Sequence, residues 1–131
     1  MEKEMKVTFP GEKRVTASYK GLVIETDQPV YQGGEGSAPA PFDLFLASIA
    51  TCSGWYVLSF CQQRKISLDG ASVIMKTERD TQKKMIVKIT IIVQLPPDFP
   101  EKYKNAVIKA INLCAVKKHM ENPPVFEVNT T

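Results

Sequence analysis

The feature that most constrains the fold of this chain is an uncharged run over residues 44–61, LFLASIATCSGWYVLSFC. Its 18 residues just reach the length of a membrane span. Three serines, a threonine, a glycine and strand-like flanking segments instead favour the central helix of a soluble fold. We expect that helix to begin near Pro41, whose fixed φ suits a first turn, and to end near Arg64 or Lys65. No membrane insertion is expected.

Composition limits the classes of protein to which the chain can belong. Its 131 residues fit one domain, residues 1–131, and 44% of them are hydrophobic, enough for a core. A net charge of +3 is too small and too dispersed to indicate a nucleic-acid partner. The first residues, MEKEMKVTF, lack the apolar stretch of a signal peptide, and three cysteines is an odd number for a secreted disulfide framework. These features predict a cytoplasmic protein with reduced thiols.

Alternating apolar and polar residues predict strands on both sides of the helix. The expected strands are residues 5–9, 14–20 and 22–26 before the helix, an antiparallel pair at 71–77 and 85–95 after it, and a last strand at 125–128. In the strand at 85–95 one face is expected to carry Met85, Val87, Ile89, Ile91, Val93 and Leu95. The order of elements indicates an α+β fold with antiparallel sheets around a long central helix.

A second helix is predicted to follow Pro96-Pro97 and to run to about Met120. Tyr103, Val107, Ala110 and Cys114 recur at spacings of four, three and four, so they form one apolar stripe. A thiol on that stripe would face the core, as Cys52 does in the middle of the first helix.

The three thiols have different possibilities. Cys61 follows Cys52 by nine residues, about 13.5 Å along a helix, whereas a disulfide needs Cα atoms about 4.4–6.8 Å apart. Cys114 could reach Cys52 if the second helix packs across the first. Each thiol could instead be a small buried hydrophobe. A metal site is not expected, because the single histidine, His119, does not share a helical face with Cys114 and no CxxC is present.

The residues after Cys52 suggest a binding surface. Trp55 and Tyr56 lie three and four positions further along the helix, so they flank the Cys52 face and could form an apolar wall for a substrate. They could also be core or interface aromatics. Gly54 lowers helix propensity, which favours a close approach of another helix, including one from a second copy of the chain.

Three segments in this order resemble the OsmC/Ohr family of osmotically inducible and organic hydroperoxide resistance proteins. They are QGGEGSAPAPFDLFLASIATC, RKISLDGASVIMKTER and LCAVKKHMENPPVFEV. The resemblance implies an OsmC-like fold in an intertwined homodimer and thiol-dependent reduction of organic hydroperoxides. Cys52 matches the peroxidatic cysteine and Cys114 the resolving cysteine. A small or protein-bound dithiol would be the reductant, and no cofactor is implied.

Ionisation of Cys52 requires a further group. Cys52 lies about ten residues into its helix, beyond the reach of the helix N-terminus, so a nearby cation is expected. The resemblance implies an arginine paired with a glutamate, for which Arg14 is the nearest candidate and Lys13 and Arg79 are weaker ones. Phe42 occupies the position that matches the glutamate.

Two functions are alternatives to a peroxidase. The chain could be a small-molecule carrier or thiol sensor without turnover, or a protein whose thiols are purely structural.

Overall fold

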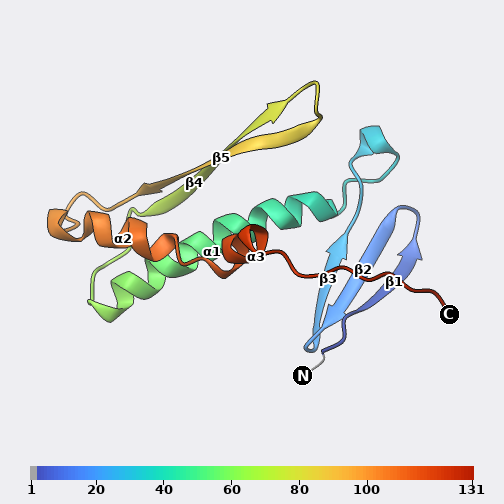
Figure 1. The fold of residues 1–131 in the computed structure, drawn as a ribbon, viewed down its shortest axis with the longest axis horizontal. Coiled ribbons are helices and arrows are strands. Elements are labelled where there is room, and N and C mark those ends of the chain that lie inside the picture. Colours follow the sequence, from blue (N-terminus) through green and yellow to red (C-terminus); the bar gives the residue numbers. More distant parts are fainter. Residues whose placement is uncertain (1–2) are drawn as a thin grey trace. The chain divides into compact units, whose positions relative to one another are not determined.

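The chain has an α+β fold with antiparallel sheets and one long helix, as the sequence predicts (Figure 1). The computed structural model describes residues 3–131. They form two compact units, one that ends at Ala47 and one over Ser48–Thr131. Each unit has its own hydrogen-bonded sheet, and the two are considered in turn.

The first unit contains a three-stranded antiparallel meander. Its strands are β1 (Lys6–Gly11), β2 (Arg14–Tyr19) and β3 (Leu22–Thr26), in that order across the sheet. Ala17 in the central strand lies opposite Val7 on one side and Ile24 on the other. Lys20 and Gly21, both at positive φ, make the tight turn between β2 and β3. All three strands agree with the prediction within a few residues.

A loop closed on the carboxylate of Asp27 follows β3. Asp27 is 1% exposed and accepts hydrogen bonds from the backbone N–H of Gln28, Glu35 and Ser37, at 2.7, 3.3 and 3.0 Å, and from the Ser37 hydroxyl at 2.6 Å. The bonds from Ser37 contribute most and outweigh burial, so the pKa of Asp27 falls to about 2. Between these anchors lies the short 3₁₀ helix η1 (Val30–Gln32).

Gly34 lets the same loop pack against itself. A Cβ on Gly34 would lie 2.0 Å from the backbone oxygen of Gln28, so only glycine fits there. Gly34, one of the glycines that the sequence groups in this loop, therefore serves a close backbone contact.

The long helix α1 (Pro41–Gln63) begins at the predicted proline and ends one residue before Arg64. Asp43 accepts the backbone N–H of Ala40 at 3.0 Å in the first turn. At the other end the Arg64 guanidinium donates to the Phe60 carbonyl at 3.3 Å. By length and composition alone α1 could also cross a membrane.

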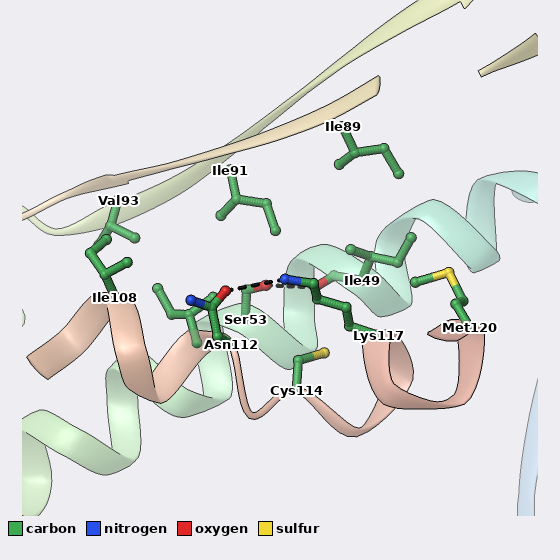
Figure 2. A pocket seen from close by; sticks show the side chains of 11 residues that line it. Ile49, Ser53, Ile89, Ile91, Val93, Ile108, Asn112, Cys114, Lys117 and Met120 are labelled. Atoms are coloured by element: carbon green, nitrogen blue, oxygen red, sulfur yellow. Dashed lines mark hydrogen bonds between the residues drawn. The ribbon is translucent and has the colours of Figure 1, made fainter. Parts of the chain in front are cut away.

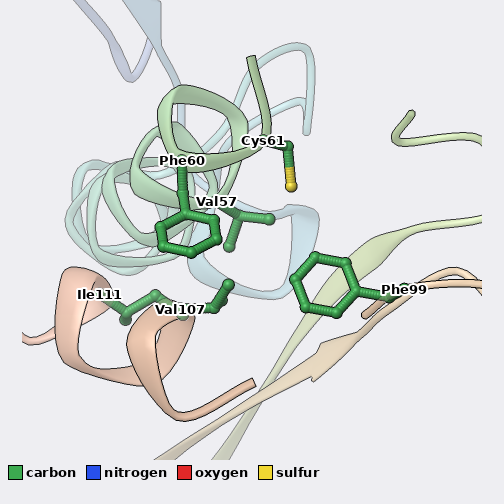
Figure 3. Packing of buried hydrophobic residues seen from close by; sticks show 6 residues of the cluster. All are labelled: Val57, Phe60, Cys61, Phe99, Val107 and Ile111. Carbon is green, nitrogen blue, oxygen red and sulfur yellow. The ribbon is translucent and has the colours of Figure 1, made fainter. Parts of the chain in front are cut away.

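One face of α1 forms the core of the second unit (Figure 3). Val57, Phe60 and Cys61 pack against residues that follow the second sheet: Phe99, Val107 and Ile111. The Phe60 ring meets the Tyr103 ring edge-on, with centroids 5.8 Å apart. These contacts bury one face of the C-terminal half of α1 within the second unit.

The second sheet is the antiparallel pair β4 (Ser72–Asp80) and β5 (Met85–Gln94). Glu78 pairs with Lys88 and Arg79 with Ile86, so Val87 is an extra residue, a β-bulge. The bulge corrects the prediction that all the apolar residues at alternate positions of this strand share one face. Ile89, Ile91 and Val93 are half-buried. Met85 and Val87, which precede them, do not share their face and are 63% and 56% exposed.

Two predictions about the C-terminal part are wrong. The expected continuous helix is the 3₁₀ turn η2 (Glu101–Tyr103) followed by two short helices, α2 (Lys104–Ile111) and α3 (Ala115–Glu121). Cys114 adopts φ −48° and ψ 122° between the helices, so it is not on a helical stripe. Residues 125–128 form no strand, because no strand within residues 3–131 pairs with them, and Val125 and Phe126 are 95% and 84% exposed.

We predict that Asp27→Asn destabilises the chain at neutral pH. A carboxyl whose pKa is lowered by folding adds stability above its ordinary pKa, about 3.9, and this contribution is lost as the pH falls towards about 2. The urea midpoints of wild type and variant should therefore differ at neutral pH and converge over that acidic window. Asp69→Asn, at an exposed carboxyl, is the matched control and should show no difference. A difference between the two urea midpoints that stays constant with pH would contradict the prediction.

Candidate active site: a pair of thiols

The structure brings Cys52 and Cys114 together. Cys52 is a partly buried residue of α1, and Cys114 is 2% exposed and immediately precedes α3. Both thiols are free, and they lie near enough for each to shift the pKa of the other. Packing of the segment between α2 and α3 across α1 therefore produces the contact that the sequence left open.

The pKa values of the two thiols are shifted in opposite directions. Burial, the largest influence, would raise the pKa of Cys52, but hydrogen bonds from the Cys114 thiol and from the backbone N–H groups of Val116 and Ala115 outweigh it, so the pKa lies below its ordinary value. The pKa of Cys114 is raised by burial, by its hydrogen bond with Cys52 and by the charge on Cys52, which together outweigh hydrogen bonds from the backbone N–H groups of Lys117 and Val116. The pair can thus hold one thiolate, on Cys52, beside one thiol, on Cys114.

The N–H groups that favour the Cys52 thiolate belong to the first turn of α3. These N–H groups have no partner within their own helix, and a thiolate nearby is stabilised by them. Sequence reasoning considered only the N-terminus of α1 and therefore expected a cation. It missed α3 because one continuous helix was expected through Cys114. The Asn112 side chain, typical of helix ends, is the only hint of the break that the sequence carries.

Cys61 is not part of the site. It is 0% exposed within the core of the second unit, and burial raises its pKa despite the nearby charge of Arg64. Its surroundings are those of a small hydrophobe.

The two aromatic residues after Cys52 have different environments. The Tyr56 hydroxyl donates to the Leu113 carbonyl at 3.1 Å, next to Cys114, so it fixes the segment that carries the second thiol. Trp55 is 57% exposed. Nothing in the described chain lies within 4 Å of a Cβ built on Gly54, so the close neighbour expected there does not come from residues 3–131 of the same chain.

Arg14 lies in the first unit. Its Nη1 is 3.8 Å from Oε1 of Glu35, and its Nε donates to the Gly11 carbonyl at 3.4 Å. An arginine–glutamate pair is therefore present, with Glu35 from the Asp27 loop as the acid. Phe42, at the position that matches the family's glutamate, is 52% exposed and packs on Phe45.

Cys114 also lines a cavity of about 340 Å³ (Figure 2). Side chains from α1, β5, α2 and α3 line it, including Ser53, Asn112 and Lys117 as well as Cys114. Sequence patterns gave no sign of it, because it depends on how four elements meet. Among the residues that the structure describes, no cluster of three His, Cys, Asp or Glu side chains could hold a metal ion.

We predict that Cys52 alkylates at lower pH than an ordinary thiol. The thiolate is the reacting form, so a lowered pKa moves the rising limb of the rate to lower pH. The rate of iodoacetamide labelling at Cys52, followed by peptide mass across the pH range, measures the midpoint. Cys114→Ala removes a donor and should raise this midpoint, whereas Cys114→Ser keeps an O–H donor and should raise it less. Identical midpoints in all three proteins would contradict the assignment of the donor.

Comparison with solved structures shows the same fold in several proteins. A Psychrobacter arcticus protein linked to osmotic stress and detoxification matches with a TM-score of 0.72 and 23% identity, over 87% of this chain and 85% of that one. An OsmC-like protein of Mycoplasma pneumoniae matches at 0.70 and 12%, over 94% and 89%. An organic hydroperoxide resistance protein, OsmC, of Legionella pneumophila matches at 0.58 and 20%, over 92% and 89%.

Sequence comparison gives the family. No curated protein matches the chain. The family model described as OsmC-like protein matches residues 34–129, a range that includes both Cys52 and Cys114. The chain therefore belongs to the OsmC-like family.

Proposed function

We propose that the chain is a thiol peroxidase that reduces organic hydroperoxides through Cys52 and Cys114. The observation that carries this proposal is the contact between a thiol of lowered pKa and a second thiol of raised pKa. Membership of the OsmC-like family supports it, as does the similarity in fold to an organic hydroperoxide resistance protein.

The reaction uses each thiol in a different role. The Cys52 thiolate attacks the O–O bond of the hydroperoxide; the leaving alkoxide takes a proton and departs as an alcohol, and Cys52 becomes a sulfenic acid. The Cys114 thiol then displaces the hydroxyl of the sulfenic acid as water, which forms the Cys52–Cys114 disulfide. A small or protein-bound dithiol returns both residues to thiols by exchange and is itself oxidised. The electrons come from the dithiol, so no cofactor is required.

Three further residues have proposed roles. Arg14, held beside Glu35, is the residue to which the family resemblance gives the role of cation for the thiolate. Trp55 and Tyr56 would form the apolar wall for the organic part of the hydroperoxide. The exposed ring of Trp55 and the fixed position of Tyr56 are compatible with this role.

A thiol sensor or small-molecule carrier without turnover is the second candidate. Phe42 stands where the resemblance implies a glutamate, which favours a protein that is oxidised once and not turned over. The two functions differ in the fate of the oxidised protein, because a sensor would keep its disulfide in the presence of a dithiol.

We also propose that the chain forms a homodimer in the cytoplasm, with no nucleic acid or membrane as partner. Large apolar side chains are exposed on the described chain, among them Trp55 in α1 and Val125, Phe126 and Val128 in the tail. A second copy could cover them. Because the family match runs through residue 47, we regard both units as parts of one domain, residues 1–131.

Peroxide consumption tests the activity. Reduced protein with cumene hydroperoxide and excess dithiothreitol should consume peroxide catalytically, and Cys52→Ser should lower the rate to that of buffer. Cys114→Ser should be oxidised once and then turn over slowly, whereas Cys61→Ala is the matched control and should retain activity. A single equivalent of peroxide consumed by wild type, with a disulfide that dithiothreitol does not reverse, would support the sensor and contradict the peroxidase.

Sedimentation tests the dimer. The wild type should sediment at twice the chain mass of 14.6 kDa. Phe126→Asp places a charge on an exposed apolar side chain and should weaken association by about tenfold or more if that side chain is buried between copies. Glu127→Gln, at the adjacent exposed residue, should behave as wild type. A wild type that remains monomeric at all concentrations would contradict the proposal.

A further inference from the structure

The cavity beside Cys114 has an aliphatic body. Six of its lining residues carry branched aliphatic side chains from α1, β5 and α2: Ile49, Ile89, Ile91, Val93, Ile108 and Ile111. Figure 2 shows the three β5 side chains pointing towards the helices. A volume of about 340 Å³ is at the low end for small-molecule pockets. At about 30 Å³ per small group, it could hold on the order of ten non-hydrogen atoms.

One lining residue of the cavity, Lys117, is cationic. The Lys117 ammonium donates to the Asn112 side-chain oxygen at 3.1 Å, and Figure 2 shows this contact beside Ser53. Lys117 takes part in none of the ion pairs within residues 3–131, which join Arg14 to Glu35 and Lys104 to Glu101. An ammonium has three donors, so two remain after the bond to Asn112.

The Ser53 hydroxyl does not compete with Lys117 as a hydrogen-bond donor to a ligand. Ser53 is 1% exposed, and its hydroxyl donates to the Ile49 carbonyl at 2.9 Å, so this hydrogen is already used. Lys117 and Asn112 are exposed residues, so the charge stays partly in water at the edge of the cavity while the aliphatic side chains define its interior. A ligand complementary to this lining would have an aliphatic body and one anionic end.

We propose that this cavity binds a small aliphatic carboxylate, with its chain among the isoleucines and its carboxylate on Lys117. Carboxylate and ammonium form a charge-assisted hydrogen bond, and the chain removes apolar surface from water. The ligand would lie against the Cys114 side chain, which also lines the cavity. The site is independent of the peroxidase reaction, since binding requires neither a hydroperoxide nor Cys52.

Octanoate, with ten non-hydrogen atoms, is the probe, and octan-1-ol is its uncharged counterpart. Reduced protein labelled with ¹³C at the methionine methyl groups reports occupancy, because Met120 lines the cavity whereas Met85 lies at the start of β5, outside the lining. We expect saturable shifts of the Met120 signal and no shift of the Met85 signal. Octanoate should bind about fivefold more tightly than octanol, the size expected for a partly exposed charged contact.

Two variants identify the cation. Lys117→Met should lower octanoate affinity about fivefold and leave octanol affinity unchanged. Lys118→Met, a neighbouring exposed lysine outside the lining, should behave as wild type. Equal effects of the two variants, an equal loss for both probes, or no Met120 shift would overturn the proposal. So would a Met120 signal that shifts with protein concentration and no longer responds to octanoate, because a second copy would then fill the cavity.

The experiment separates this inference from the proposed activity. Binding is measured on reduced protein without hydroperoxide and can be repeated with Cys52→Ser. Failure of octanoate to bind would leave the peroxidase proposal intact, and failure of peroxide reduction would leave the carboxylate site intact.

Discussion

The site depends on the break between α2 and α3. At this break the chain leaves helical geometry for Cys114, and α3 then begins with N–H groups that have no partner inside the helix. Those of Ala115 and Val116 act on the Cys52 sulfur, together with the Cys114 thiol. A continuous helix would have used its N–H groups internally. The interruption therefore supplies both the second thiol and the donors that make the first one acidic.

The sequence was a good guide to local structure. The limits of α1 followed from Pro41 and from the cations after Gln63, and the strands followed from alternation and turn residues. The family resemblance, built on the loop, the helix and the second cysteine segment, was confirmed by the family model. These features are local in the chain, so the order of residue types is enough to predict them.

Features that depend on packing were not predictable in the same way. The break at Cys114 interrupts an apolar stripe of regular spacing, so periodicity alone predicts a continuous helix there. The bulge at Val87 reverses the facing of a strand whose alternation looks uniform. The cavity arises where four elements meet, and no segment contains a sign of it. Each of these outcomes is decided by the burial of particular side chains in three dimensions.

The complete burial of Cys61 limits the products of oxidation. A thiol enclosed by Val57, Phe60 and Phe99, with its ionisation disfavoured, is a poor nucleophile and out of contact with oxidants in solution. A sulfenic acid formed on Cys52 would therefore meet only one competing thiol within the chain. Three cysteines could in principle give three different disulfides, yet the core leaves a single route. Oxidative scrambling is thus suppressed by where the third sulfur lies, without any need to replace it.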